Sequence, residues 1–458
     1  LEFRRVLFRS IIVGGKGRKH PKEADVFLHI AMKVAKNCRY VEPQFTLRFD
    51  KETSEEIWDE ALDALGAGAT YPTLYNDDVN VPAVMYGMRV DEKTAEQYVP
   101  FGCTEFVIQG QSTGTPNICI NLLKLLTIYM NDGIDPIDGK RKSGPVPLKK
   151  LEEYQTFEEF YDGYKALLDY YLDLSVKAQY HSYEVMNQHV SFLFTSLLTD
   201  DCIARGKALL DGGVRYLGGT NETYGNINTS DSLWVIRDLV FNQKKYTLRQ
   251  LNDAMLANFN GYEALRKDCL NCDKYGNDLE TADTMANDLY EFVAKGVRNR
   301  GIAIGMQYFL IVISNNQLNT EWGNRTAASP DGRLSCMYMN PANNPQGGAN
   351  KSGPTAMLNS LAKFDAKYHG GSVQNIKFSP SMFNENRAVI KSLFKTYFAK
   401  GGCHLMVTVV DKGVLEDAVE HPENYPDLIV RVSGFSAVFV DLSPNIQQEL
   451  LSRVLYDK

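Results

Sequence analysis

The sequence predicts a large protein of the α/β class. Short runs of β-forming residues, such as 44–49 and 405–410, alternate along the chain with longer segments whose apolar residues recur at spacings of three and four. This alternation is typical of strands connected by helices. The length of 458 residues and the hydrophobic content of 44% are sufficient for an extensive core.

The helices are predicted from amphipathic spacing and from capping residues. In the segment 53–65, Thr53 and Ser54 can cap a helix, and two glutamates follow in its first turn. The predicted helices are 23–36, 53–65, a short one after residue 78, 118–130, 157–198, 231–240, 247–256, 280–297, 355–363 and 386–399.

The strands are predicted from apolar runs that end at polar residues or glycine. The predicted strands are 44–49, 209–217 (ending at Gly218-Gly219), 306–313, 373–378 and 405–410. Polar segments at 75–78 and 132–147 and a turn at 115–117 are predicted to connect these elements.

Composition restricts the partners of the protein. A net charge of -7 and a pI near 5.7 argue against a broad nucleic-acid surface, and no apolar run is long enough to span a membrane. The eight cysteines are scattered, with Cys269 and Cys272 as the only close pair, and the seven histidines show no ligand spacing. We therefore expect a cytoplasmic protein with no metal, nucleic-acid or membrane partner.

Residues 1–10 are treated separately from the fold. They resemble translated cloning or adapter sequence, since no signal-peptide core or cleavage site follows them. The absence of an initiator Met leads us to expect an N-terminally truncated reading frame.

Gly434 interrupts a run of β-formers near the C-terminus, within Arg431-Val432-Ser433-Gly434-Phe435-Ser436-Ala437. A glycine there indicates a bulge or turn, or a place where the backbone approaches another group closely. This segment resembles the glycyl radical signature of the pyruvate formate-lyase family. Five further motifs follow the family's order: Asn76-Asp77-Asp78, Lys274-Tyr275-Gly276-Asn277-Asp278, Ser329-Pro330-Asp331-Gly332-Arg333, Lys351-Ser352-Gly353-Pro354-Thr355 and Lys377-Phe378-Ser379-Pro380.

The resemblance implies a fold and a domain division. Family members form a ten-stranded α/β barrel of two five-stranded halves, with two finger loops that meet inside. The resemblance runs from residue 11 onward, so we expect the C-terminal half of such a barrel. We expect a barrel domain at 11–320 with the cysteine loop and a glycine radical domain at 321–458. With one half missing, we expect exposed apolar faces and an inactive isolated chain.

The resemblance also assigns a second reacting residue. Gly102-Cys103-Thr104-Glu105 resembles the family's cysteine finger, which implies that a Gly434 radical is relayed to a Cys103 thiyl with Glu105 as acid/base. In an extended segment residues two apart face the same side, so we expect the Glu105 carboxylate beside the sulfur. Taken alone, Cys103 could be an inert buried thiol and Glu105 a solvated carboxylate.

The same residues indicate a subclass. Formate acetyltransferases carry two adjacent cysteines, whereas Gly102 precedes Cys103 here, and nothing in the sequence places Cys119 in the site. The Cys-x-Glu form resembles dehydratases and related lyases that cleave C–O, C–N or C–S bonds, and also arylacetate decarboxylases. A non-enzymatic alternative is a spare glycyl radical subunit, which the presence of the cysteine loop disfavours.

Further residues are assigned supporting roles by the resemblance. We expect Arg431, Ser433, Phe435 and Ser436 to support the radical loop, and Phe106 and Ser314 to line the substrate pocket. No cofactor is expected to be bound permanently, because an S-adenosylmethionine/iron–sulfur activase would install the radical at Gly434. The expected partners are this activase, a small-molecule substrate and, as is common in the family, a second copy in a homodimer. Oxygen sensitivity of the radical implies the cytoplasm of an anaerobic bacterium.

Overall fold

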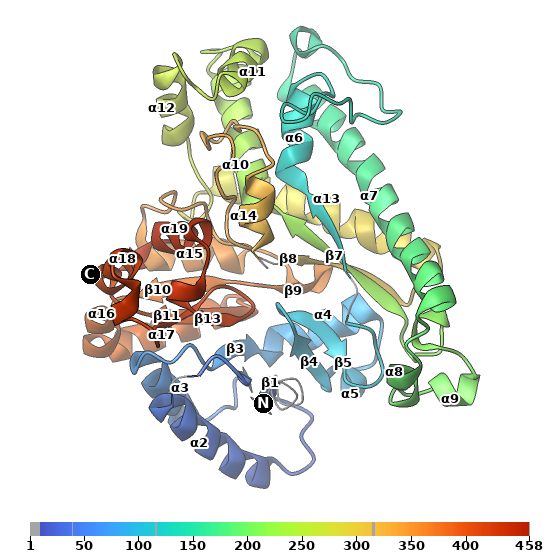
Figure 1. Ribbon diagram of the computed structural model, residues 1–458, viewed down its shortest axis with the longest axis vertical. Coiled ribbons are helices and arrows are strands. Elements are labelled where there is room, and N and C mark those ends of the chain that lie inside the picture. Colours follow the sequence, from blue (N-terminus) through green and yellow to red (C-terminus); the bar gives the residue numbers. More distant parts are fainter. Residues whose placement is uncertain (1–9, 39, 115–116, 314–316, 458) are drawn as a thin grey trace.

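The structure, a computed structural model, describes residues 10–38, 40–114, 117–313 and 317–457. It confirms the predicted α/β class, because most described strands lie in two sheets whose neighbouring strands are parallel except for the pair β3–β11. Figure 1 shows the four-stranded sheet near the middle of the molecule. Helices α2 and α3 lie at the bottom of the molecule in this view. The more detailed description as half of a ten-stranded barrel stays a prediction.

The described strands form two sheets and two separate hairpins. The six-stranded sheet has the order β1 (Ser10–Gly14), β2 (Gln44–Phe49), β3 (Thr73–Asn76), β11 (His404–Val409), β10 (Asn375–Phe378) and β14 (Leu455–Tyr456). The four-stranded sheet has the order β6 (Ile118–Asn121), β7 (Gly218–Tyr224), β8 (Tyr308–Ile313) and β9 (His369–Ser372). The hairpins pair β4 (Tyr98–Phe101) with β5 (Glu105–Ile108) and β12 (Ile429–Arg431) with β13 (Ser436–Val438).

Most predicted helices are confirmed, with ends that differ by a few residues. The described helices are α2 (Pro21–Asn37), α3 (Glu55–Gly66), α4 (Asp77–Met88), α5 (Glu92–Ala95), α6 (Leu122–Met130), α7 (Phe157–His189), α8 (Leu193–Leu197), α9 (Cys202–Arg205), α10 (Asn226–Val235) with a π-helical extension (Ile236–Asn242), α11 (Leu248–Leu256), α12 (Glu263–Asn271), α13 (Glu280–Ala303), α14 (Leu318–Gly323), α15 (Gly353–Ala362), α16 (Pro380–Glu385), α17 (Arg387–Ala399), α18 (Lys412–Glu420) and α19 (Pro444–Ser452).

The main core lies around the four-stranded sheet. All six residues of β8 are buried, as expected for a central parallel strand with helices on its faces. Helix α13 packs against β8, and the long helix α7 packs against α13 (Figure 1). The predicted strand 306–313 and helix 280–297 are therefore confirmed, and both contribute to the main core.

The predicted helix 118–130 begins too early. Residues Ile118–Asn121 form strand β6, which pairs with β7, and α6 begins only at Leu122. The Asn121 side chain caps α6 by accepting a hydrogen bond from the backbone N–H of Lys124. The mostly apolar segment 118–130 therefore contains a strand followed by a helix, and its residue types alone do not show where the strand ends. Residues 115–116 of the predicted turn lie outside the described residues.

The predicted strand 209–217 is wrong. The strand is β7, Gly218–Tyr224, whose seven residues are all buried although most are polar. Hydrogen bonds satisfy these polar groups: Asn221, for example, donates to the Ser175 hydroxyl of α7 at 2.7 Å. Sequence reasoning took the apolar segment before Gly218 for the strand because it did not expect a polar strand in the interior.

The polar loop predicted at 75–78 is also wrong. Asn76 ends strand β3, and Asp77 begins helix α4. Asp77 is fully buried, and Arg48 of β2 compensates its charge through two hydrogen bonds, at 2.9 and 2.7 Å. Tyr98 of β4 donates a further hydrogen bond to the same carboxylate at 2.9 Å. A buried ion pair therefore joins the six-stranded sheet to the base of the first hairpin.

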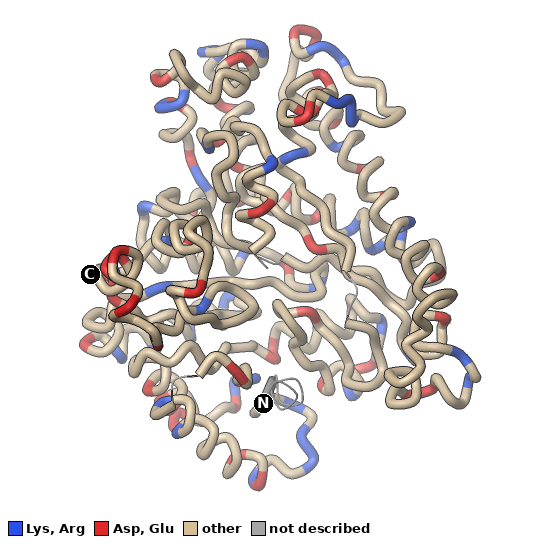
Figure 2. Tube along the Cα trace, in the orientation of Figure 1, with Lys and Arg blue, Asp and Glu red and all other residues tan. Residues whose placement is uncertain are grey.

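Charged residues are spread over the surface. Figure 2 shows acidic and basic residues interspersed along the helices, in agreement with the modest net charge of -7. Among the described residues, no helix combines the length and the apolar character that crossing a bilayer requires.

Some apolar side chains are strongly exposed. In and beside α8, Leu193, Phe194, Leu197 and Leu198 are between 62% and 76% exposed. Single exposed apolar residues are common, but a contiguous group of this kind is typical of a contact surface.

Candidate active site

Cys103 lies at the tip of the first hairpin, here called the cysteine hairpin (β4, residues 102–104 and β5). Phe101 pairs with Glu105, so residues 102–104 form a three-residue turn between the strands. Gly102 and Thr104 both have positive φ, 54° and 93°, which makes the turn tight. Cys103 is only 6% exposed.

Gly434 lies at the tip of the second hairpin, here called the glycine hairpin (β12, residues 432–435 and β13). Arg431 pairs with Ser436, so Gly434 belongs to the connecting loop. A Cβ atom added to Gly434 would lie 2.3 Å from the sulfur of Cys103 and 2.6 Å from its Cα. Only a glycine can therefore occupy this position, and its Cα lies against the thiol.

A second glycine, Gly371, packs closely against the cysteine turn. A Cβ atom on Gly371 of β9 would lie 2.1 Å from the carbonyl oxygen of Thr104, and Gly371 has a φ of 138°. The four-stranded sheet thus makes direct backbone contact with the cysteine turn. The side chain of Cys103 also packs against Ala342, Val373 and Met406.

The residues predicted to support the glycine loop lie within it or at its two ends. Arg431 donates to the Ser436 hydroxyl at 3.3 Å, and its guanidinium lies 5.2 Å from the centre of the Tyr71 ring. Phe435 packs into the small apolar cluster of the C-terminal segment, which also contains Phe439 and Leu450.

Three hydrogen bonds connect the glycine hairpin to the six-stranded sheet and its neighbouring loop, and one of them runs from Arg431 Nε to the sulfur of Met406 at 3.3 Å. The Gln44 side chain donates to the carbonyl oxygen of Gly434 at 2.9 Å, and Ser436 donates to the Thr70 hydroxyl at 2.9 Å. The hydroxyl of Ser433 is buried and has no hydrogen-bond partner among the described residues. The loop is therefore held mainly through Gly434 and Ser436.

Glu105 lies beside the cysteine turn, but for a different reason from the one predicted. The segment from Cys103 to Glu105 is a turn and not an extended strand, because Thr104 has a φ of 93°. The Glu105 carboxyl folds back over the turn, about where a side chain on Gly102 would be, with an oxygen 3.0 Å from that position. Glycine at 102 thus leaves space for the carboxyl.

The Glu105 carboxyl belongs to a polar network that sequence reasoning missed. The Asn117 side chain donates to Glu105 at 3.1 Å and to Glu222 of β7 at 2.7 Å. Thr220 donates to the Asn117 side-chain oxygen, and Tyr224 donates to Glu222 at 2.5 Å. Asn117 therefore bridges two carboxyl groups in a buried site.

Burial sets the protonation of this network. It raises the pKa of Glu105 to about 8, and the nearby charge of Glu222 adds to the rise, while hydrogen bonds from backbone amides and Asn117 oppose it. Near neutral pH, Glu105 is therefore largely protonated but can still lose its proton. Such a group can act as both an acid and a base.

Cys119 lies closer to this network than the sequence indicated. It is on β6, directly opposite Glu222 of β7. Burial raises the pKa of its thiol to about 12, with Glu222 and Glu105 as further causes. Cys119 is thus a neutral thiol at the edge of the site and not an activated nucleophile.

Phe106, which was predicted to line the substrate pocket, packs into an apolar cluster. Successive residues of a strand face opposite sides, so Phe106 points away from the side on which Glu105 lies. Its ring packs edge-on against Tyr98, with ring centres 5.3 Å apart, in a cluster that includes Tyr308 and Leu310. Ser314, the other predicted pocket residue, lies outside the described residues.

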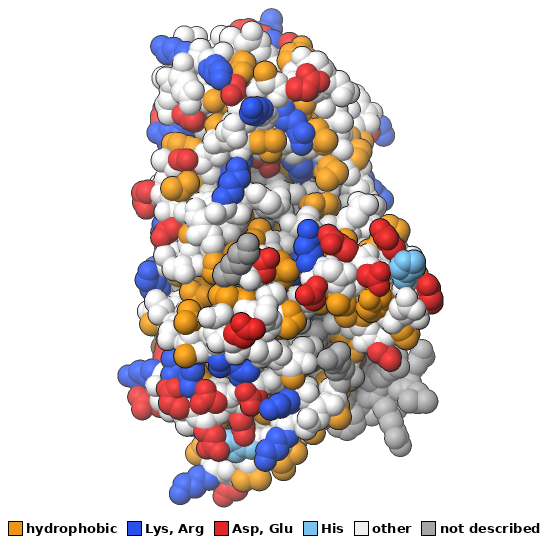
Figure 3. Space-filling view, turned by 90° about the vertical axis from the view of Figure 1, so that its left-hand side faces the viewer, with side chains coloured by type: hydrophobic (Ala, Val, Ile, Leu, Met, Phe, Trp, Pro, Cys, Tyr) orange, Lys and Arg blue, Asp and Glu red, His pale blue; other side chains and the backbone are white. Residues whose placement is uncertain are grey.

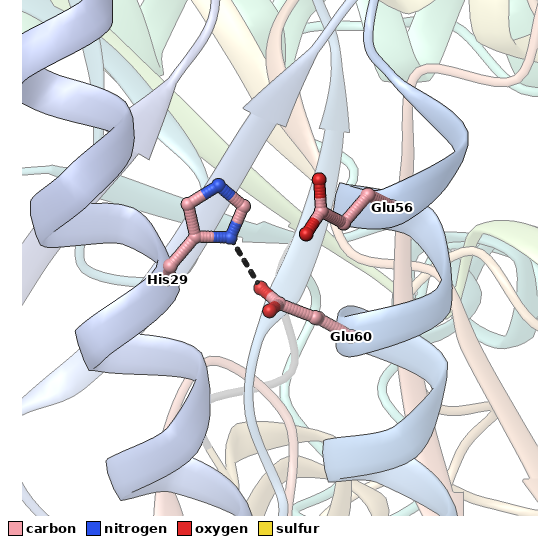
Figure 4. A group of neighbouring side chains, drawn as sticks. All are labelled: His29, Glu56 and Glu60. Carbon is pink, nitrogen blue, oxygen red and sulfur yellow. Dashed lines mark hydrogen bonds and ion pairs between the residues drawn. The ribbon is translucent and has the colours of Figure 1, made fainter.

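One further group of side chains could share a cation. His29 of α2 and Glu56 and Glu60 of α3 place one donor atom each within 4.8 Å of one another, as Figure 4 shows. His29 and Glu60 already form a 2.7 Å hydrogen bond, which accounts for their proximity. These helices contribute no side chain to the network around Cys103 and Gly434 described above.

Comparisons with known proteins agree with this geometry. A model of the family described as Pyruvate formate lyase-like matches residues 4–318, and a Glycine radical model matches residues 339–440. The chain is 29% identical over 449 residues to trans-4-hydroxy-L-proline dehydratase of Clostridioides difficile, covering 97% of this chain and 56% of the relative. It is 26% identical over 502 residues to a 4-hydroxyphenylacetate decarboxylase glycyl radical subunit of Clostridioides difficile strain CD196, covering 98% and 54%.

A solved structure shows the same likeness in three dimensions. The glycerol-bound form of the B12-independent glycerol dehydratase from Clostridium butyricum has a TM-score of 0.90 and 28% sequence identity, covering 98% of this chain and 57% of that chain. The chain therefore spans somewhat more than half the length of the relatives it matches.

Proposed function

Because the chain belongs to the pyruvate formate lyase-like family, we propose that it carries the radical centre of a dehydratase-type lyase. The observation that carries this proposal is the contact between the two hairpin tips. The Cα of Gly434 lies against the sulfur of Cys103, although 331 residues separate them in the sequence. A hydrogen atom can move between these two atoms without a large conformational change.

The unpaired electron passes from Gly434 to Cys103, then to the substrate, and finally back to Gly434. A radical on the Gly434 Cα takes the hydrogen of the Cys103 thiol, so that the S–H bond breaks, a Cα–H bond forms and the unpaired electron passes to sulfur. The thiyl then takes a hydrogen from a substrate carbon next to one that bears a leaving group. The thiol returns a hydrogen to the product radical, and the glycine radical is restored.

Glu105 manages the proton in the elimination. It removes the proton of the substrate heteroatom while a neighbouring hydroxyl, amine or sulfonate leaves, and the proton then passes to the leaving group. A pKa of about 8 suits transfer in both directions near neutral pH. The hydrogen-bonded Asn117 holds Glu105 in place, and Glu222 provides a second carboxyl for proton exchange.

The geometry disfavours a formate acetyltransferase. That reaction needs a second cysteine next to the radical cysteine, and residue 102 is a glycine whose added Cβ would lie 3.0 Å from a Glu105 carboxyl oxygen. Cys119, on the neighbouring strand β6, is held as a neutral thiol. An arylacetate decarboxylase is the second candidate, because one of the relatives is named as such and Glu105 could deprotonate an arylacetate instead.

Installation of the radical requires a partner. We propose a radical S-adenosylmethionine activase, which must reach a glycine that is covered by Cys103 in this arrangement. The glycine hairpin would therefore leave the cysteine hairpin during activation, and Arg431, Ser433, Phe435 and Ser436 would guide its return. We also propose a homodimer in an anaerobic cytoplasm.

Electron paramagnetic resonance tests the proposal. The protein expressed from its complete gene is activated anaerobically beside a Gly434→Ala variant. We expect a doublet from the coupling of the unpaired electron to the remaining Cα hydrogen, and we expect no signal in the variant. If the doublet is absent although the activase works on another substrate protein, Gly434 only permits a bend in the backbone and carries no radical. A panel of polyols, hydroxyproline, choline, isethionate and arylacetates would then separate dehydratase from decarboxylase.

A further inference from the structure

Three of the sequence motifs that follow the family's order have no part in the radical site, yet they meet elsewhere. Lys274 and Asn277, Asp331 to Arg333, and Lys351 with Ser352 come from three separate loops and line one cavity. Its volume is about 530 Å³, which lies within the range typical of small-molecule sites. Cys103, Glu105 and Gly434 do not line it.

The cavity has an unusual charge arrangement. Four basic side chains line it: Arg266, Lys274, Arg333 and Lys351. Within the described ranges, none of these four side chains has a carboxylate partner at ion-pair distance, although many surface lysines and arginines of this protein do. Lys274 is 8% exposed and Arg333 is 5% exposed, so two of the unpaired cations are nearly withdrawn from solvent. Buried charges normally require a partner.

The protein satisfies these cations only in part. Lys274 donates to the backbone carbonyls of Cys269 and Cys272 at 2.6 and 3.2 Å, which leaves its third ammonium hydrogen without an acceptor in the described part of the chain. Arg333 donates to the carbonyl oxygens of Met337 at 2.6 Å, Thr326 at 3.2 Å and Ala327, and only its Nε is buried without a hydrogen-bond partner among the described residues. Arg266 uses only its Nε in a described hydrogen bond, to Gly332 at 2.9 Å.

The acidic residues of the cavity do not balance this charge. The Asp331 carboxylate accepts hydrogen bonds from the Asn228 amide at 2.6 Å and from the Ser329 hydroxyl at 2.6 Å. Asp231 accepts a hydrogen bond from the backbone of Tyr275 through one oxygen, and its other oxygen is buried without a partner in the described structure. Burial raises the pKa of Asp231 to about 7, so near neutral pH it carries only part of a negative charge. Asp273 is the third aspartate that lines the cavity.

We propose that this cavity is a binding site for a small organic anion with a carboxylate or phosphate group. Lys274, Arg266 and Lys351 would hold the anionic group, since charge-assisted hydrogen bonds from these side chains match carboxylate and phosphate oxygens. Figure 3 shows the side of the molecule that carries the C-terminal helices, where separate basic side chains lie among polar surface in the upper half.

This site is distinct from the proposed substrate site. A ligand there would not contact the radical residues, so its binding does not depend on activation or on the identity of the substrate. Binding and radical formation can therefore fail independently, and each can be measured without the other.

Isothermal titration calorimetry on the protein expressed from its complete gene tests the site, at neutral pH and constant ionic strength. Citrate, glycerol 3-phosphate and inorganic phosphate are the probes. We expect saturable one-to-one binding of citrate or glycerol 3-phosphate, and the preferred probe identifies the anionic group. Lys351→Glu and Arg266→Met should each weaken binding by about tenfold or more, as expected for loss of a charge-assisted hydrogen bond.

A matched variant controls for net charge. Lys207→Glu changes an exposed lysine that does not line the cavity, and it should leave affinity unchanged. Heats that do not saturate for any probe, or equal losses in Lys207→Glu and Lys351→Glu, would overturn the proposal. Lys351 is exposed, so its variant is expected to fold, and circular dichroism checks this.

Discussion

The two hairpins that meet at the radical site differ in how they are attached to the rest of the protein. Arg48 binds the backbone of the cysteine hairpin at Tyr98 (2.9 Å) and pairs with the buried Asp77. Tyr98, Phe106 and Ile108 of this hairpin also pack into a cluster with residues of α4 and β8. The cysteine hairpin is therefore fixed to the body of the protein by a buried ion pair and by apolar packing.

The glycine hairpin belongs to a smaller unit. Its residues Val430 and Val432 pack with Leu415 of α18 and Ile446 and Leu450 of α19, in a cluster separate from the main core. A cavity of about 50 Å³ lies between this unit and strands β10 and β11. The difference between the hairpins suits the proposed activation, in which the glycine leaves while the cysteine stays in place.

The largest expected effect separates the chemical roles of the two hairpins. Cys103→Ala should keep the Gly434 radical but lose turnover by at least ~1000-fold, because no thiol remains to relay the hydrogen atom. Cys119→Ala is the matched control and should retain activity, since Cys119 lies at the edge of the site. Resonance spectra and product assays on both activated variants measure this. Equal activity of the two variants would remove Cys103 from the mechanism.

The next effect concerns the anchoring of the cysteine hairpin. Arg48→Met leaves the buried carboxylate of Asp77 without its cation, which should lower the free energy of unfolding by about 3–5 kcal/mol. Lys16→Met breaks the pair with Asp78, in which both side chains are 32% exposed, and should cost at most about 1 kcal/mol. Urea unfolding followed by circular dichroism compares them. Similar losses for the two variants would mean that the buried pair does not anchor the hairpin.

A titrating carboxyl further distinguishes the cysteine hairpin. The pKa of Glu105 is raised from 4.5 to about 8 by burial, so the folded protein binds its proton more tightly than the unfolded chain. This contribution to stability is fully present below about pH 4.5 and is lost as the pH rises toward 8. Glu105→Gln should remove the loss, which is on the order of a few kcal/mol.

Unfolding of wild type and Glu105→Gln across this pH window measures the difference. Glu52→Gln changes an exposed glutamate and serves as the control, for which the pH dependence should match that of wild type. A parallel pH dependence in the Glu105 variant and wild type would show that Glu105 does not titrate as its surroundings indicate.

The sequence predicted much of the site because its strongest signals are local. Gly434 and Cys103 each lie in a short motif, and the structure brings them into contact. The position of Glu105 was predicted for the wrong reason, because the positive φ of Thr104 cannot be read from residue type alone. Phe106, which was predicted to line the pocket, points to the opposite side of the strand from Glu105.

The missed residues depend on long-range pairing. Asn117 reaches Glu222 because β6 and β7 lie side by side, although 105 residues separate the two side chains in sequence. Neither residue lies in a recognisable motif, and β7 carries no apolar pattern that would identify it as a strand. Polar residues in a buried strand are a signal only after their partners are known.

The smallest expected effect tests how the glycine hairpin is held. Gln44→Ala removes the hydrogen bond to the Gly434 carbonyl, which should ease local opening by about 0.5–1.5 kcal/mol. Hydrogen exchange followed by mass spectrometry should show faster exchange in residues 432–438 and no change in residues 98–108. Gln97→Ala is the matched control, because it removes a similar bond from a glutamine side chain to the Gly17 carbonyl at 3.1 Å. If exchange rises equally in both hairpins, or in neither, the glycine hairpin is not the separately opening unit that activation requires.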